Sequence, residues 1–372
     1  MRILLVVWNF YPNTAYTNHT KATVRGMREC GCEVDVLSIK PLTHDDKDCI
    51  KGQRKTATSA IPTAWGMLMD FCLLNKRVKE YDVIYCATSD IKVINLVMRK
   101  ARKHGLPVVH ERTEMPDIFY SDTAKSQKAL NRYLRKVSEF DKVFTISNPI
   151  RDYFIKKSVQ ANKIHIYPMI VDPHRFDCVK KQDVGYKYMA YCGNLSNSKD
   201  GVADLIEAYG RSRAKDSHKL ILIGSKPKGE EQTLYDRLIK DYALAEKVFF
   251  RGQVSRDEMP QQLKDADVLL LSRPNNRQAL GGFPTKLGEY LLTGNPVLVT
   301  RVGDIDKYII DGENGYLAAP NDVAGFAAKI DYIVEHYNEA LLVGKKGRDL
   351  ALDSFNCSVQ TRKVVDILKS LV

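Results

Sequence analysis

The chain has 372 residues, of which 44% are hydrophobic, and a formal net charge of +12. This length exceeds one ordinary hydrophobic core and predicts two domains of about 150–200 residues each. No apolar run reaches the roughly 20 residues that a membrane span needs. The opening segment MRILLVVWNFYP indicates a buried strand rather than a secretory signal, because no small-residue cleavage site follows it. We therefore expect a cytoplasmic protein whose eight scattered cysteines are reduced and mostly buried.

The positive charge is unevenly distributed along the chain. Residues 1–183 carry a net charge of about +11, whereas residues 184–372 are nearly neutral. A strongly basic half can attract nucleic acid, an anionic membrane surface or a phosphorylated acceptor. The asymmetry therefore predicts different partners for the two halves.

The first half alternates between short apolar runs and helical patterns. Strands are predicted at 2–8, 33–39, 82–88, 107–111 and 142–147, and helices at 17–30, 63–79, 90–104 and 124–139. Near-continuous apolar strands separated by helices are typical of a parallel sheet that is covered on both faces. This half is predicted to form a domain over residues 1–180.

The second half repeats this alternation after a polar segment at 178–187, which lacks periodicity and is interpreted as the linker. Strands are predicted at 188–193, 219–224, 247–252, 267–272 and 296–300, with helices at 201–213, 230–243, 257–265 and 285–293. Closing helices are expected at about 322–337, 341–352 and 356–370. The predicted fold is α/β, with two doubly wound Rossmann-like domains facing across a cleft. The second domain covers 181–355, and the last helix, 356–372, is expected to return toward the first domain.

The segment YCGNLSNSKDG at 191–201 follows the first strand of the second half and leads into a helix. Backbone N–H groups at a helix start, together with Lys199, would suit a phosphate. An ordinary strand-to-helix turn with Asp200 as the N-cap residue explains the sequence of this segment equally well. Neither a GxGxxG nor a GxxxxGK[ST] sequence occurs in the chain, which disfavours dinucleotide oxidoreductases and P-loop nucleotidases.

The segment GGFPTKLGEYLLTGNPVL at 281–298 combines glycines, a helix start and a single carboxylate. Pro284 suits the first turn of a helix, so Glu289 is expected little more than one turn inside it. A carboxylate at that place can accept hydrogen bonds from two ribose hydroxyls. The amides near Gly281–Thr285 could hold sugar hydroxyls or phosphate oxygens, whereas the simpler alternative is a solvated helix glutamate.

Five segments in this order resemble the donor domain of retaining GT-B glycosyltransferases of the glycosyltransferase 4 type. They are YCGNLSNSKDGVADLIEAY, KLILIGS, VFFRGQVSRDEMPQQLKDADVLLLS, GGFPTKLGEYLLTGNPVLVT and DGENGYL. The resemblance is strong over 185–335, and IYPMIVDPHRF at 166–176 is similar to the family's segment before the linker. The first half resembles the family more loosely, through its opening strand, CGCEVDVLS and VVHERTE.

The resemblance implies a nucleoside-diphosphate sugar as donor and a saccharide or lipid-linked saccharide as acceptor, in surface polysaccharide or glycolipid assembly. It implies that Glu289 binds the ribose and Lys199 the diphosphate, and that His110 lies near the reacting phosphate and acceptor. It places Gln253 and Val254 beside the base, and Ser225 and Lys226 in the loop bordering the nucleotide. Further donor contacts are expected from Asn194, Gly282, Phe283, Pro284, Thr285 and Lys286.

The chain departs from the family pattern at three places. Gly281 stands where the family's E-x7-E motif has its first glutamate, and backbone amides at Gly282 and Phe283 are expected to serve instead. Asn194 stands where the family has an arginine that partners the diphosphate lysine, so Lys199 is expected to act with Thr285 and Lys286. The glycine pair after the first strand is missing from YPNTAYTNHT.

Metal binding is not expected, and no cofactor besides the sugar nucleotide is implied. The DAD at 265–267 and the DID at 304–306 mimic the DxD of metal-dependent transferases, but the first spans a helix-to-strand turn and suits a capping or solvated role. A metal site is also not expected at His110, Glu111 and Glu114, because this segment contains no second histidine.

Two basic segments, 65–79 and 125–137, predict peripheral attachment to the inner face of an anionic membrane, or grip on a lipid-diphosphate acceptor. Plain solvated helix faces explain the same pattern. Two other functional classes also remain: an epimerase- or phosphorylase-like relative that processes sugar nucleotides, and a non-catalytic binding protein. Nucleic acid is not an expected partner, because the aromatic stacking motifs of known modules are not visible.

Overall fold

The computed structural model describes residues 1–11, 14–43, 46–50, 53 and 77–372. The chain divides into two compact units, one of residues 1–170 with 357–372 and the other of residues 171–356. The change from the first unit to the second therefore comes earlier than the predicted boundary after residue 180. Most of the predicted helix at 63–79 lies outside the described residues.

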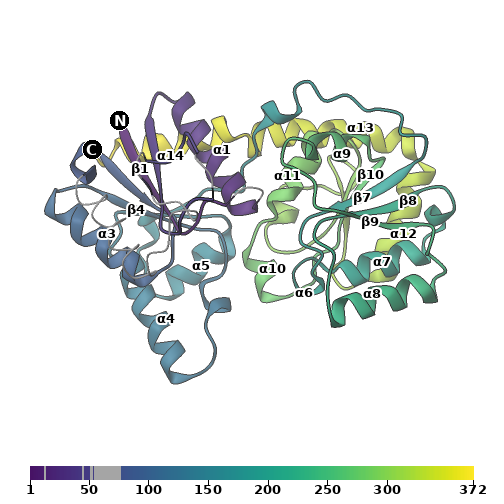
Figure 1. The fold of residues 1–372 in the computed structure, drawn as a ribbon, viewed down its shortest axis with the longest axis horizontal. Coiled ribbons are helices and arrows are strands. Elements are labelled where there is room, and N and C mark those ends of the chain that lie inside the picture. The colour runs from purple at the N-terminus through teal and green to yellow at the C-terminus, as the bar shows by residue number, and fades with distance from the viewer. Residues whose placement is uncertain (12–13, 44–45, 51–52, 54–76) are drawn as a thin grey trace. The chain divides into compact units, whose positions relative to one another are not determined.

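The first unit contains a six-stranded parallel sheet in the order β2-β1-β3-β4-β5-β6 (Figure 1). The strands are mostly fully buried, as their near-continuous apolar sequences predict. Their bounds are Arg2–Val7 (β1), Glu33–Ser38 (β2), Val83–Cys86 (β3), Val108–Arg112 (β4), Lys142–Thr145 (β5) and Ile164–Ile166 (β6). The strand order reverses between β1 and β3, which makes the carboxyl edge there a topological switch point.

Three helices of the first unit begin at polar residues whose side chains cap them. Thr14, Asp90 and Thr123 accept backbone N–H groups in the first turns of α1, α3 and α4. The helices are Ala15–Glu29 (α1), Ile91–Lys103 (α3), Ala124–Val137 (α4), Asn148–Lys156 (α5) and Cys357–Lys369 (α14). The last of these packs along α1 although it comes from the far end of the chain (Figure 1).

The second unit contains another six-stranded parallel sheet, in the order β12-β11-β10-β7-β8-β9. Its strands are Tyr188–Cys192 (β7), Lys219–Ile223 (β8), Val248–Gly252 (β9), Val268–Leu271 (β10), Val297–Thr300 (β11) and Tyr316–Ala318 (β12). The order reverses between β7 and β10, so the loops that follow these two strands lie at the switch point of this sheet.

The helices of the second unit lie on both faces of its sheet (Figure 1). They are Asn197–Asp200 (α6), Val202–Arg211 (α7), Glu230–Asp241 (α8), Met259–Asp265 (α9), Arg277–Gly281 (α10), Thr285–Leu292 (α11), Val323–Glu335 (α12) and Tyr337–Leu350 (α13). Helix α7 packs against α8 and α12, and α11 packs against α13. The two sheets with their helices give the two-domain α/β fold that the sequence predicts. In the described part of the chain, no helix is both long and apolar enough to cross a membrane.

Candidate functional site

The carboxyl edge of the second sheet is built from closely approaching backbone turns after β7 and β8. Gly193 has φ +147°, and a Cβ on it would lie 2.2 Å from the Nζ atom of Lys286. Gly224 has φ +155°, and a Cβ there would lie 1.9 Å from the carbonyl oxygen of Gly193. Only glycine fits such backbone with such neighbours. The two turns therefore pack against each other and leave space for the lysine.

Lys286 lies in the first turn of α11 and forms a nearly buried ion pair with Asp200. Its Nζ donates to Asp200 Oδ2 at 2.7 Å and to the hydroxyl of Tyr191 at 2.8 Å. The exposed fractions of the side chains are 3% for Asp200 and 17% for Lys286. The Tyr191 hydroxyl also lies 2.8 Å from Asp200 Oδ2, so the three groups form a closed triangle.

A second cation approaches the same carboxylate. The buried Arg273 follows β10, places Nε 3.8 Å from Asp200 Oδ1 and donates from Nη1 to the carbonyl oxygen of Gly282 at 3.0 Å. Burial alone would raise the pKa of Asp200, but Lys286, Arg273 and the Tyr191 hydroxyl outweigh it and hold that pKa below its usual value. Two cations, Lys286 and Arg273, thus lie around the Asp200 carboxylate at this edge of the sheet.

Helix α11 carries Glu289 beside this cluster. Tyr290, four residues after Lys286 and so on the same face, accepts the backbone N–H of Cys192 at 2.6 Å and ties α11 to the end of β7. Burial raises the pKa of the Cys192 thiol to about 12, with Lys286, Glu289 and Arg175 as the nearby charges. The Glu289 carboxylate is ion-paired with Arg175, and its side chain is 20% exposed. Glu289 and Lys286, both singled out in the sequence, are thus brought to one place.

The short segment before α11 is shaped by packing. Phe283 is buried and contacts the rings of Tyr308 and Phe355 at centroid distances of 5.4 and 5.6 Å. Pro284 is the N-cap residue of α11, and Thr285 is its first residue. No side chain among the described residues caps this N-terminus, so its amides and the positive end of the helix dipole are available to an anion.

The remaining predicted donor residues lie at more exposed positions. Lys199 is half-buried on α6, and Asn194 is exposed, with its carbonyl oxygen accepting from the Tyr191 hydroxyl at 2.7 Å. Gln253, after β9, donates to the hydroxyl of Ser225, after β8, at 2.7 Å. Lys226, which follows Ser225 in the chain, is exposed, and Val254, which follows Gln253, is half-buried. Among the described residues, the Asn194–Tyr191 and Gln253–Ser225 hydrogen bonds do not involve Lys286 or Glu289.

His110 lies in the core of the first unit. Its Nδ1 is 2.9 Å from the carbonyl oxygen of Cys86, its Nε2 is 2.8 Å from the hydroxyl of Tyr133, and its ring stacks on Phe140. The side chain is fully buried. Burial lowers its pKa to about 3, so the imidazole is neutral at pH 7. Both ring nitrogens have protein partners, and this geometry describes a residue that fixes β4 to α4.

The neighbouring Glu111 faces the other side of the same sheet and pairs with a residue that the sequence reasoning did not single out. Glu111 Oε1 lies 2.6 Å from Nε2 of His19 on α1, and both side chains are 6% exposed. The His19 ring lies against Tyr167, and Nδ1 of His19 has no partner among the described residues. The two faces of β4 thus carry a buried histidine, His110, and a buried carboxylate, Glu111, which pairs with His19 of α1.

The acidic triplets take structural roles. Asp265 accepts the backbone N–H of Gln182 at 2.8 Å, and Asp267 accepts that of Tyr188 at 2.9 Å, so both hold the segment before β7. Asp304 is buried and paired with Lys307 at 2.8 Å. Among the described residues, no group of three or more His, Cys, Asp or Glu side chains could hold a metal ion.

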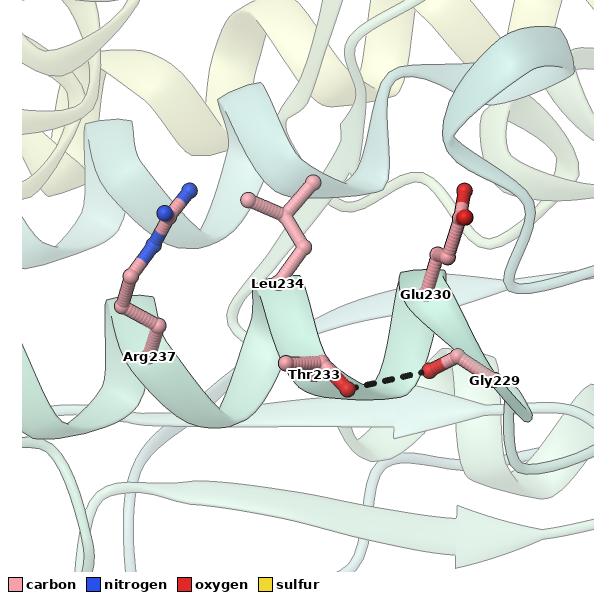
Figure 2. Close-up of a pocket in the computed structure, with 5 residues that line it drawn as sticks. All are labelled: Gly229, Glu230, Thr233, Leu234 and Arg237. Carbon is pink, nitrogen blue, oxygen red and sulfur yellow. Dashed lines mark hydrogen bonds between the residues drawn. The ribbon is translucent and has the colours of Figure 1, made fainter.

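One open hollow lies along the first two turns of α8. It is lined by Gly229, Glu230, Thr233, Leu234 and Arg237, and the Thr233 hydroxyl donates to the Gly229 carbonyl oxygen at 3.3 Å (Figure 2). The lining contains none of the residues predicted from the sequence. Its chemistry is that of an exposed helix face, and it is distinct from the Lys286–Asp200 cluster.

The two-domain fold is that of the GT-B glycosyltransferases. The structure superposes on Anabaena HepE in complex with UDP-glucose with a TM-score of 0.76, over 100% of both chains at 18% identity. The group 1 glycosyl transferase model matches residues 176–350, and the glycosyltransferase family 4 model matches residues 17–175. The chain therefore belongs to the glycosyltransferases of this group 1 and family 4 type, as the resemblance of its motifs predicts.

Two relatives show how far the similarity extends. An uncharacterized glycosyltransferase of Methanocaldococcus jannaschii is 22% identical over 99% of this chain and 98% of its own length. The N-acetyl-alpha-D-glucosaminyl L-malate synthase of Bacillus anthracis is 26% identical over 75% of this chain and 78% of its own length. The similarity thus extends over both halves of the chain.

Proposed function

We propose that this glycosyltransferase uses a nucleoside-diphosphate sugar and transfers the sugar, with retention, to a saccharide or lipid-linked saccharide. The donor is assigned to the carboxyl edge of the second sheet, with its ribose at Glu289 and its diphosphate at Lys286 and the start of α11. The single observation that carries this assignment is the pair of cations, Lys286 and Arg273, at the Asp200 carboxylate. The complexes of HepE with UDP and UDP-glucose support a donor of this class.

The chemistry follows from the charge that develops when the sugar leaves. Departure of a nucleoside diphosphate places growing negative charge on the leaving phosphate, and fixed cations and amide dipoles stabilise it best when they need no rearrangement. Lys286 meets this requirement because Asp200 and Tyr191 already hold its ammonium group. Retention is inferred from the family resemblance, and the assignment includes no metal ion.

The proposal gives Lys286 the leading role and Lys199 a supporting one. Lys286 is fixed by two hydrogen bonds at the end of β7, whereas Lys199 lies in the last turn of the short helix α6. His110 is assigned to packing of the first unit rather than to contact with the substrate, because both of its ring nitrogens have protein partners.

The first unit is proposed to face the acceptor and an anionic membrane on the cytoplasmic side. Along α4 the apolar residues are buried, and four basic residues are exposed: Lys125, Lys128, Arg132 and Arg135. Phe119, in the short 3-10 helix Pro116–Phe119 before α4, is 59% exposed. Exposed cations on a helix, with an exposed aromatic ring shortly before it in the chain, are a composition that interfacial binding uses.

The assignment is tested by nucleotide binding. UDP, GDP, ADP and their glucose and mannose conjugates are titrated into the wild-type protein by calorimetry, with slow donor hydrolysis followed in parallel. We expect one nucleoside diphosphate to bind, and Lys286→Ala to lower donor turnover by about 10²–10³-fold, the effect of losing one preorganised donor. Glu289→Ala should weaken binding of the nucleoside itself.

Lys247→Ala is the matched control, because Lys247 forms an exposed ion pair with Asp216 on the same unit. It should leave nucleotide affinity unchanged. Unaltered affinity in both the Lys286 and Glu289 variants would refute the proposed site. Salt-sensitive binding of nucleic acid, with no effect of any nucleotide, would instead favour a non-catalytic binding protein.

A further inference from the structure

Arg175 joins three segments of the second unit at the carboxylate of Glu289. It lies in the 3-10 helix Pro173–Phe176, where Asp172 accepts the backbone N–H of His174 at 3.2 Å and fixes the turn. Its Nη1 donates to Oε1 of Glu289 on α11, and its Nη2 donates at 2.6 Å to the backbone carbonyl oxygen of Arg256, after β9. The Arg175 side chain is only 11% exposed.

This ion pair uses one oxygen of the Glu289 carboxylate and leaves the other oxygen available to a ligand. Within the described part of the chain, Oε2 of Glu289 has no hydrogen-bond partner, whereas Oε1 is held by the guanidinium. A guanidinium held at two points cannot rotate without breaking the bond to the Arg256 carbonyl, so it fixes the direction of the carboxylate. A fixed, ionised carboxylate with one open oxygen is ready to accept hydroxyl donors.

The Arg175–Glu289 ion pair lies among further charged residues. Arg256 is a second cation near the pair, and burial followed by Arg175 lowers its pKa. Three carboxylates near Arg256, those of Asp172, Glu289 and Asp257, oppose this lowering. Immobilising an almost buried arginine costs side-chain entropy, and the gain is a carboxylate with one defined orientation.

We propose that Arg175 is the positioning residue that orients Glu289 to accept the ribose hydroxyls of the nucleoside-diphosphate donor. The inference rests on the proposed function, because it takes Glu289 as the ribose-binding residue. Arg175 acts through Glu289 and does not itself contact the base or the diphosphate. Its loss should therefore weaken recognition of the ribose specifically, and should have no effect once Glu289 is gone.

The experiment compares ribonucleotides with nucleotides that lack the ribose hydroxyls. UDP, GDP and ADP, each with its 2′,3′-dideoxy form, are titrated into the wild type, Arg175→Ala, Arg175→Lys, Glu289→Ala and the double variant Arg175→Ala/Glu289→Ala. A hydrogen bond to a charged group contributes about 1.5–3 kcal/mol, which is a factor of about 10–100 in affinity. We expect Arg175→Ala to weaken the ribonucleotide about tenfold and the dideoxy form by less than twofold.

Two comparisons separate positioning from a general structural effect. Arg175→Lys keeps the charge but not the two-point hold, so it should recover only part of the affinity. The double variant should bind no more weakly than Glu289→Ala. Arg213→Ala is the matched control, because it removes an arginine that is 75% exposed and paired with Asp331 and Glu335. It should change neither affinity.

Each outcome decides between the two proposals. Equal losses for the ribo and dideoxy forms, or additive losses in the double variant, would overturn the positioning role. The positioning role would also be overturned if Arg175→Ala bound the ribonucleotide with wild-type affinity while Glu289→Ala bound it weakly. The proposed donor site would stand in that case. If Glu289→Ala binds as well as the wild type, or if no nucleotide binds at all, the proposed donor site fails and the inference fails with it.

Discussion

Removing the ammonium group of Lys286 should destabilise the second unit by about 3 kcal/mol at pH 7. Breaking a buried ion pair by deleting one partner typically costs about 3–5 kcal/mol, because the other charge is left uncompensated. Asp200 would keep the Tyr191 hydroxyl at 2.8 Å and Arg273 at 3.8 Å, which places the expected cost at the lower end. Lys286→Met is the suitable change because it preserves most of the side-chain stem.

The pH dependence follows from the lowered pKa of Asp200. A carboxyl whose pKa is lower in the folded state stabilises the fold above its unfolded value of about 3.9 and loses that contribution as the pH falls further. In Lys286→Met, burial is no longer offset by the ammonium group, so Asp200 should take up a proton at a higher pH. The stability difference from the wild type should therefore shrink as the pH approaches 4.

The assay is guanidinium denaturation followed by far-UV circular dichroism, combined with hydrogen exchange of peptides covering β7 and α11. The second measurement is needed because two units can unfold separately. The cycle of Lys286→Met, Asp200→Asn and the double variant should give a coupling energy of about 1–3 kcal/mol, as expected for contacting residues. A coupling near zero, or a Lys286→Met variant within about 0.5 kcal/mol of the wild type, would refute the reasoning.

Two further predictions concern the first unit. Because burial lowers the pKa of His110 to about 3, stability should fall by up to about 1.4 kcal/mol per unit as the pH drops below about 6.5. His110→Gln should flatten that slope in acid denaturation, and an unchanged slope would contradict the assignment. Replacing the four exposed basic residues of α4 by glutamine should weaken sedimentation with phosphatidylglycerol vesicles by about 1 kcal/mol for each residue. Loss of binding at high salt should accompany it, and equal binding of the variant to these vesicles would refute a membrane role for α4.

Several features of the fold could be predicted from local sequence. Apolar runs separated by helical patterns indicated parallel sheets, and the second-unit strands β7, β8, β9, β10 and β11 form where the sequence predicts them. Pro284 predicted the start of α11, and the apolar side of α4 is the side that is buried. The strands β6 and β12, of three residues each, were not predicted, because such short segments carry too little periodicity to be recognised.

The candidate site was predicted only in part. Lys286 and Glu289 were singled out because one segment carries both, but their partners are far away in the sequence. Asp200 is 86 residues from Lys286, and Arg175 is 114 residues from Glu289. The local amino-acid sequence around Arg175 does not distinguish it from a solvated arginine. For His110 the resemblance implies a place near the reacting phosphate, and only the structure shows that its ring contacts Tyr133 and Phe140.

The sequence by itself determined the elements, their alternation and the family of the chain, because periodicity and motif spacing are local properties. Only the tertiary structure decided which charges meet. The order of strands in the second sheet brings the loops after β7 and β10 to one edge, and α11 begins beside them. Ion pairing depends on distance in space, and that distance is set by strand order and by the glycine turns at Gly193 and Gly224.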